Sequence, residues 1–182
     1  MFQDFSIYEE GYARFTSDKR KVEWLAVRAL LKELCGEEKS VSYYPSGKPY
    51  LTDGSARISF SHTQGYVAVA VHPCKEVAVD IEQYGTRVKR VAHKFIRGDE
   101  QIPAEPLQEI QALLLHWSAK ETLYKLLDKE GVDFIRHLQV FPFELVEEGE
   151  FVACEHLTEQ NECFPVHYHT HPHYVLTYAS RP

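Results

Sequence analysis

This sequence contains the same order of predicted elements twice, one helix followed by several short strands. Residues 17–34 carry apolar side chains at helical spacing, with Ser17 or Asp18 as the cap and Gly36 as the stop signal. Segments typical of strands follow at 57–61, 66–71 and 77–81. The first part of the chain is therefore expected to combine one helix with a small antiparallel sheet.

The second part repeats this order. A short helix is expected at 87–96 and a long one from Pro106 to Lys129, ending before Gly131. Alternating segments then predict an antiparallel meander: 138–146, 150–156 and 174–179. The whole chain is expected to have an α+β fold.

Length and composition agree with one small soluble protein. The 182 residues, of which 44% are hydrophobic, suit one domain or two small lobes that share a core. No leader or membrane span is apparent, so we expect a cytoplasmic protein. Four cysteines without a CxxC pair predict reduced thiols rather than a disulfide framework or a zinc site: Cys35, Cys74, Cys154 and Cys163.

The net charge of −7 is unevenly distributed. Residues 137–180 contain seven glutamates and neither lysine nor arginine, which leaves the rest of the chain neutral. Within that remainder, residues 87–97 carry five Lys/Arg and no acid, and residues 14–32 carry six Lys/Arg against two acids. Such clusters suit phosphates or an acidic protein surface, and a solvated helix face is an equally good interpretation of each alone.

Acidic residues at two places are candidates for a catalytic site. Asp80 and Glu82 lie two apart on a predicted strand, so both side chains point to the same side. In the long helix, five residues at i, i+3, i+4, i+7 and i+8 share one face: Trp117, Lys120, Glu121, Tyr124 and Lys125. Two alternatives remain open. Glu121 and Lys125 would form an ordinary surface ion pair, and Asp80 and Glu82 would lie on a solvent-exposed strand edge.

Four motifs in this order resemble the surfactin-synthetase-activating (Sfp-type) 4'-phosphopantetheinyl transferases. They are GKPYL at 47–51, FSHT at 60–63, VDIE at 79–82 and WSAKETLYK at 117–125. The resemblance spans residues 19–125. It implies two similar α/β lobes related by a pseudo-twofold axis, each with a long helix packed on a small antiparallel sheet. Residues 1–74 and 75–182 would form the lobes, with coenzyme A in the cleft between them.

The resemblance implies that this protein transfers the phosphopantetheine arm of coenzyme A to a serine of an apo acyl or peptidyl carrier protein. Asp80, Glu82 and Glu121 match the acidic residues that bind Mg²⁺ at the pyrophosphate. The family does not always have an acid at the position of Glu82. Lys120 and Lys125 would hold phosphate oxygens. Either Glu121 or Glu100 would accept the serine proton, and the sequence does not decide between them.

The resemblance also implies contacts with both substrates. Ser61 and His62 match a pair that contacts the 3'-phosphate of coenzyme A, and Lys48 and Arg28 would complete the nucleotide site. Basic residues after the metal-binding strand are expected to dock an acidic carrier protein: Arg87, Lys89, Arg90 and Lys94. We expect a monomer that binds neither nucleic acid nor membrane.

Two features depart from the family pattern. Ala78 stands where the family usually has glycine, and we expect this to be tolerated. His167, His169, His171 and His173 recur at period two, which on one strand would form a metal-binding face, but Pro172 interrupts the strand. Two other functions remain open: an Mg²⁺-dependent phosphohydrolase and a non-catalytic module that binds coenzyme A or a carrier protein.

Overall fold

The computed structural model describes residues 6–181. In the first part, two helices precede two hairpins: α1 (Ser6–Ala13), α2 (Asp18–Cys35), β1 (Val41–Tyr43), β2 (Pro49–Leu51), β3 (Arg57–Thr63) and β4 (Tyr66–His72). The central elements are β5 (Glu76–Gln83), α3 (Arg87–Val91) and the 3₁₀ turn η1 (Ala92–Lys94). One helix and four strands complete the chain: α4 (Pro106–Leu127), β6 (Leu138–Val140), β7 (Glu148–Glu155), β8 (Cys163–His171) and β9 (Tyr174–Arg181). This mixture confirms the α+β class.

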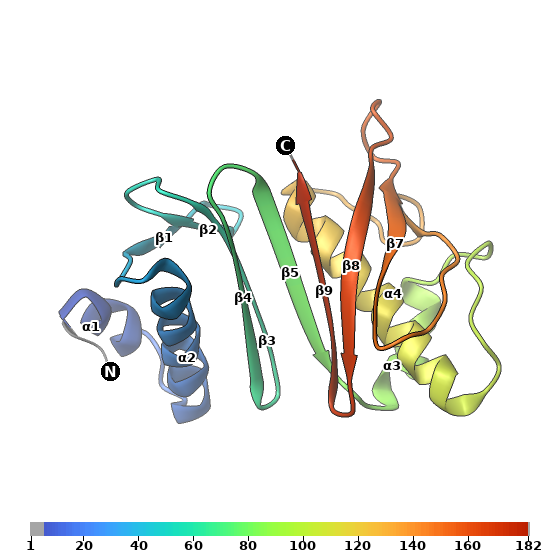
Figure 1. Cartoon of the computed structure of the whole chain (residues 1–182), viewed down its shortest axis with the longest axis horizontal. Coiled ribbons are helices and arrows are strands. Elements are labelled where there is room, and N and C mark those ends of the chain that lie inside the picture. Colours follow the sequence, from blue (N-terminus) through green and yellow to red (C-terminus); the bar gives the residue numbers. More distant parts are fainter. Residues whose placement is uncertain (1–5, 182) are drawn as a thin grey trace.

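The second part of the chain is built on a five-stranded antiparallel sheet in the order β5-β9-β8-β7-β6. Helix α4 covers one face of this sheet (Figure 1). Its buried leucines pack with the inward side chains of β8 and β9, among them Val166 and Val175. The largest apolar core of the described residues therefore lies between α4 and this sheet, and it fixes where the polar side chains of α4 stand relative to β5.

Helix α2 ends as the sequence predicts. Gly36 follows the last turn with φ of 75°, in the left-handed region that glycine enters without a steric penalty. Leu31 of α2 packs with Ile58 and Phe60 of β3, which point to the same side because strand residues alternate. The odd-numbered side chains of β3 therefore point away from α2.

Strand β3 lies beside β5 without a backbone ladder between them (Figure 1). Hydroxyl side chains of β3 make the connection instead, because the β5 amides of Val79, Ile81 and Gln83 donate to the side-chain oxygens of Ser59, Ser61 and Thr63 at 3.2, 3.3 and 3.3 Å. These hydroxyl oxygens accept hydrogen bonds from β5 amides that would otherwise be unpaired at the edge of the sheet. We call these three contacts the hydroxyl junction.

Most of the predicted elements match the structure, and four elements were not predicted: α1, β1, β2 and β8. Strands β3, β4 and β5 and helices α2 and α4 lie where the sequence places them, whereas the expected helix at 87–96 divides into α3 and η1. Strand β8 was not predicted as a separate strand. Pro165 lies inside it opposite Val152, and proline cannot donate to a ladder, so the sequence argued against a strand there. Pro172 lies in the turn to β9.

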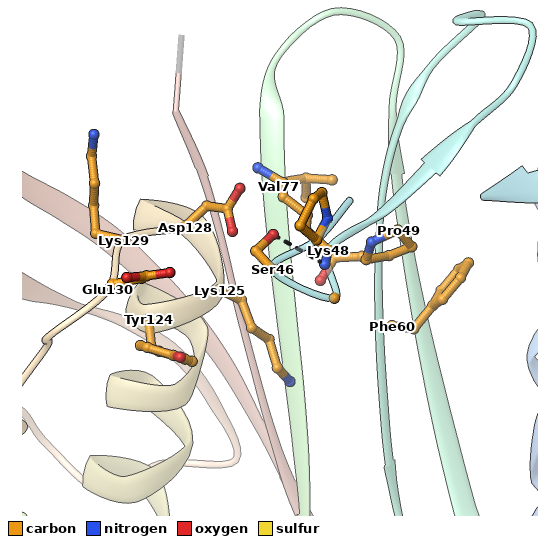
Figure 2. A pocket seen from close by; sticks show the side chains of 13 residues that line it. Ser46, Lys48, Pro49, Phe60, Val77, Tyr124, Lys125, Asp128, Lys129 and Glu130 are labelled. Atoms are coloured by element: carbon orange, nitrogen blue, oxygen red, sulfur yellow. Dashed lines mark hydrogen bonds between the residues drawn. The ribbon is translucent and has the colours of Figure 1, made fainter. Parts of the chain in front are cut away.

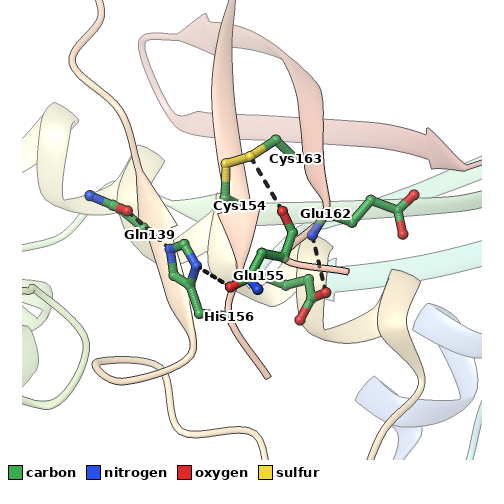
Figure 3. The surroundings of a disulfide bond; sticks show 7 residues. Gln139, Cys154, Glu155, His156, Glu162 and Cys163 are labelled. Carbon is green, nitrogen blue, oxygen red and sulfur yellow. Dashed lines mark hydrogen bonds between the residues drawn. A yellow bond between two sulfur atoms is a disulfide. The ribbon is translucent and has the colours of Figure 1, made fainter. Parts of the chain in front are cut away.

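The prediction that all four cysteines are reduced is wrong for two of them. Cys154 and Cys163 are directly opposite each other on β7 and β8 and form a disulfide (Figure 3). Cys35 and Cys74 are free. The pairing depends on the register of two strands, which no local cysteine motif reports. Next to the disulfide, the buried Glu155 carboxylate accepts the backbone amides of Leu157 and Thr158 at 2.8 Å and so fixes the turn that returns to β8.

The histidines of the C-terminal part face carboxylates. His167 Nδ1 lies 3.1 Å from Glu150 Oε2, and His169 Nδ1 lies 3.0 Å from Glu148 Oε1, across the β7–β8 ladder. Between residues 6 and 181, no group of three His, Cys, Asp or Glu side chains forms a ready-made metal site. The histidine row therefore gains no support as a metal-binding face. In the same range, no helix is both long and apolar enough to cross a membrane.

Candidate functional site

The candidate site lies where β5 runs beside α4. Asp80 and Glu82 are on the face of β5 that points toward α4, because their register partners Thr177 and Val175 on β9 are fully buried beneath that helix. Glu121 and Lys125 occupy successive turns of α4 and face this strand. The sequence-based prediction that two carboxylates from a strand meet a helix carboxylate and a lysine describes this arrangement.

The three carboxylates influence one another electrostatically. Burial, followed by the charge of Asp80, raises the pKa of Glu82 to about 7, although the indole of Trp117 donates to Glu82 Oε1 at 2.8 Å. Burial and the charge of Asp80 also raise the pKa of Glu121. Ionised carboxylates gathered in a partly dehydrated place repel one another, and a bound cation relieves that repulsion.

Asp80 is the most constrained member of the group. Its Oδ1 accepts the Lys125 ammonium at 2.8 Å and the Ser61 hydroxyl at 2.9 Å. Its Oδ2 is buried and has no hydrogen-bond partner among the described residues. A buried carboxylate oxygen without a partner is costly, so this atom is available to a ligand that carries positive charge.

These residues fit a magnesium ion. The unpartnered Asp80 oxygen and the mutual repulsion of three carboxylates both favour a cation, and carboxylate oxygens are the ligands that Mg²⁺ prefers. The side-chain oxygens are of the kind that Mg²⁺ binds, but among the described residues they do not converge into a ready-made metal site. Mg²⁺ usually keeps several waters and takes further oxygens from a phosphorylated substrate, so a protein-only cage is not required.

A cavity of about 450 Å³ opens beside this group. Figure 2 shows Tyr124 and Lys125 of α4, with Asp128 just after the helix, on one side of it, and Ser46, Lys48, Pro49 and Phe60 on the other. The 47–51 motif therefore faces the long helix across an open space. Lys48 forms an ion pair with Glu76 at 2.7 Å, so its charge is partly balanced within the protein.

A second cavity, of about 350 Å³, lies between α2 and β3 and contains two of the predicted nucleotide residues. Arg28 is buried, donates to the Tyr43 hydroxyl at 3.0 Å and lies over the Trp24 ring at 4.3 Å. His62 enters the same cavity from β3. The alternation of β3 thus places His62 beside α2.

Arg20 also lines this cavity and was missed by the sequence analysis. Its Nη1 lies 2.7 Å from His62 Nε2, and because arginine can only donate, the histidine nitrogen accepts. Burial and the Arg20 charge lower the pKa of His62. Arg20, Trp24 and Arg28 stand at i, i+4 and i+8 of α2, a spacing that would have identified Arg20 from the sequence.

Two of the expected contacts differ in the structure. Ser61 does not share the cavity of its neighbour His62, because adjacent strand residues point to opposite sides, and its buried hydroxyl donates to Asp80. Lys120 lies in the interior rather than in the cleft. Its fully buried ammonium contacts the carbonyl of Phe134 at 3.1 Å and the carboxylate of Glu100 at 2.8 Å.

Glu100 is equally buried and is surrounded by donors. Besides Lys120, the backbone amides of Arg97 and Val140 donate to its two oxygens at 2.8 Å. A carboxylate held in this way has no free oxygen for an incoming proton, and its contacts tie the segment after η1 to α4 and β6. Glu121, by contrast, has no hydrogen-bond or ion-pair partner among the described residues.

The predicted docking residues are on α3 and η1, directly after β5. Arg87, Lys89, Arg90 and Lys94 are all exposed. Lys89 forms an ion pair with Glu109 of α4, so its charge is balanced within the protein. The other three have no ion-pair partner among residues 6–181.

Comparison with known proteins identifies the family of this chain. A search among curated proteins found no match for this chain. The family model of the 4'-phosphopantetheinyl transferase superfamily matches residues 76–179, which is more than half of the chain and extends from β5 into β9. Proteins of this family transfer phosphopantetheine from coenzyme A. The matched segment contains Asp80, Glu82, Glu121 and Lys125, and the chain belongs to the 4'-phosphopantetheinyl transferase superfamily.

Proposed function

We propose that this protein transfers the 4'-phosphopantetheine moiety of coenzyme A to a serine of an apo acyl or peptidyl carrier protein, in a reaction that requires Mg²⁺. The observation that carries the proposal is the group formed by Asp80, Glu82, Glu121 and Lys125 beside an open cavity, within the segment that matches the family. The Sfp-type motifs in the first part of the chain favour this subtype.

The proposed reaction is a substitution at the β-phosphorus of coenzyme A. The carrier serine oxygen forms a bond to that phosphorus, the bond to the bridging oxygen breaks, and adenosine 3',5'-bisphosphate leaves. Glu121 accepts the serine proton, because its carboxylate is free whereas Glu100 is fully occupied. Lys125 neutralises phosphate charge. Asp80, Glu82 and Glu121 would hold Mg²⁺, which supplies further neutralisation of the pyrophosphate.

We also propose that the chain consists of two lobes, residues 1–74 and 75–182, related by a pseudo-twofold axis. The order α2-β1-β2-β3-β4 parallels the order α4-β6-β7-β8-β9, and the family match begins at the first residue of β5. The sheets differ, since the first part contains two separate hairpins and the second a five-stranded sheet. The cavity beside Lys48 and Lys125 would lie between the lobes and accept coenzyme A.

A labelling experiment tests the proposed function. The protein is incubated with a fluorescent coenzyme A and several apo carrier proteins, with and without Mg²⁺, and label on the carrier is followed by gel and by intact mass. We expect label only with Mg²⁺, and none on a carrier whose target serine is replaced by alanine. Cleavage of coenzyme A without any carrier would instead favour the phosphohydrolase.

The nucleotide end of the site gives a further prediction. If Arg20, Arg28 and His62 bind the 3'-phosphate, the protein should use dephospho-coenzyme A about 10–100-fold less efficiently in kcat/KM, since hydrogen bonds to charged groups contribute about 1.5–3 kcal/mol. Arg20→Ala should narrow that difference, because the lost partner makes removal of the phosphate less costly. Arg136→Ala, which changes an exposed arginine between α4 and β6, is the control. Equal use of both cofactors by the unmutated protein would contradict this assignment.

The docking surface gives another prediction, again measured kinetically. Arg90→Glu should raise the KM for the carrier protein several-fold and weaken the salt dependence of that KM, while the KM for coenzyme A stays constant. Surface pairs contribute only about 0.2–1 kcal/mol each, so Arg87→Glu/Arg90→Glu should have a larger effect than either change alone. Lys75→Glu makes the same charge change at the opposite end of β5 and should leave the carrier KM unchanged. If the KM for coenzyme A changes and the KM for the carrier protein does not, these arginines bind coenzyme A rather than the carrier protein.

A further inference from the structure

Ser61 makes two hydrogen bonds at the hydroxyl junction. Its Oγ accepts the amide of Ile81 at 3.3 Å and lies 2.9 Å from Asp80 Oδ1. A serine hydroxyl has one hydrogen and two lone pairs, and a backbone amide can only donate. The hydroxyl hydrogen is therefore directed at the carboxylate. Both groups are buried, where a hydrogen bond to a charged acceptor is strong.

The contact determines which Asp80 oxygen is free. Ser61 and Lys125 both donate to Oδ1, at 2.9 and 2.8 Å, while Oδ2 has no partner among the described residues. Two donors on one oxygen hold the carboxylate in a single rotation about its Cβ–Cγ bond. The lysine side chain is long and partly exposed, whereas Ser61 is short and attached to a strand. Ser61 is thus the more rigid of the two supports.

The neighbouring hydroxyls show that the junction itself does not require this contact. Ser59 and Thr63 accept the amides of Val79 and Gln83 in the same way as Ser61 accepts Ile81. Neither of these two hydroxyls has a hydrogen bond to a carboxylate among the described residues. Among the three hydroxyls of the junction, only that of Ser61 is hydrogen-bonded to Asp80.

We propose that Ser61 is a positioning residue for the transfer reaction, which orients Asp80 so that its Oδ2 is presented to a divalent cation. This role rests on the proposed Mg²⁺-dependent function. It replaces the contact with the nucleotide 3'-phosphate that the family resemblance implies for Ser61. Hydrogen-bond partners of metal ligands generally contribute 10–100-fold to metal affinity or activity, which sets the expected size of the effect.

The test compares Ser61→Ala with Thr63→Val, which removes an equivalent bond of the junction without touching a carboxylate. Mg²⁺ binding is measured by calorimetry in the presence of coenzyme A and without a carrier protein, so that no transfer occurs. We expect Ser61→Ala to weaken Mg²⁺ binding about 10-fold or more, Thr63→Val to bind as the unmutated protein does, and Ser61→Thr to restore binding. Ser59→Ala, at a similarly buried position, serves as the control for stability.

The outcomes separate this role from the others. Equal Mg²⁺ affinity in Ser61→Ala and Thr63→Val would overturn the positioning role and leave the proposed function intact, provided the unmutated protein transfers with Mg²⁺. A loss of discrimination against dephospho-coenzyme A in Ser61→Ala, with unchanged Mg²⁺ affinity, would assign Ser61 to the phosphate instead. An unmutated protein that binds no divalent cation would overturn both proposals. If Ser61→Ala does not fold, Ser61→Cys is compared with Ser59→Cys by the same measurement.

Discussion

Asp80→Asn and Glu121→Gln are each expected to reduce transfer by more than about 100-fold while the protein stays folded. A bound cation contributes several kcal/mol to transition-state charge stabilisation, and each 1.36 kcal/mol corresponds to a factor of ten in rate. Burial raises the pKa of Glu82 and of Glu121, and the charge of Asp80 raises both further, so in the absence of metal removing one charge relieves part of the repulsion. The free energy of unfolding of Glu121→Gln should therefore not fall when metal is absent, whereas Asp80→Asn also weakens the ion pair with Lys125 and should be slightly less stable.

The measurement pairs transfer rates with urea unfolding in a chelator. Glu33→Gln, an exposed acid on α2, controls for the change in net charge and should transfer normally. Chelation of Mg²⁺ in the unmutated protein should reduce transfer as strongly as the two substitutions do. Transfer at the unmutated rate by either variant, in a folded protein, would show that the carboxylate is not part of the reaction site.

The second large effect is expected at the buried pair of Lys120 and Glu100. Lys120→Met leaves the Glu100 carboxylate buried without its charged partner, which costs about 3–5 kcal/mol of unfolding free energy for pairs of this kind. Glu100→Gln keeps the shape and one acceptor oxygen, and it leaves the buried Lys120 ammonium with backbone carbonyls but without a charged partner. Both single variants should therefore be destabilised, and their loss of transfer should follow the loss of folded protein.

A double-mutant cycle tests this structural role against a catalytic one. Lys120→Met/Glu100→Gln removes both charges, so it should be more stable than the sum of the single changes predicts. Glu121→Gln is the matched comparison, since it alters the free carboxylate of the same helix without removing a buried partner. A Glu100→Gln protein that keeps its stability but loses transfer would make Glu100 the general base after all.

Helices α2 and α4 and most of the strands could be predicted because their signals are local. Apolar spacing in α2 and α4, the stop at Gly36 and the alternation in β3, β4 and β5 all lie within a few residues of one another. Strand β8 could not be predicted in the same way, because Pro165 contradicts a strand locally and the partner strands β7 and β9 outweigh it. The disulfide was missed for the same reason, since it follows from the β7–β8 register.

The candidate site was predicted as a set of residues rather than as an arrangement. Asp80, Glu82, Glu121 and Lys125 lie near one another, as strand alternation in β5 and the helical repeat in α4 predict. Lys120 and Glu121 are adjacent in the sequence, so their side chains point in directions about 100° apart around the helix. Lys120 therefore points into the core while Glu121 faces the cleft. Ser61 and His62 separate because neighbouring residues of a strand face opposite sides.

The sequence by itself determined most of the longer elements, the family resemblance and the residue types that a phosphoryl-transfer site needs, because motifs and periodicity are properties of short stretches. Only the tertiary structure decided which polar groups are free. Burial leaves Asp80 Oδ2 without a partner, encloses Glu100 with Lys120, and brings Arg20 to His62 across 42 positions of the chain. Such pairings depend on packing between distant segments, where the cost of burying an unpaired charge selects the partners.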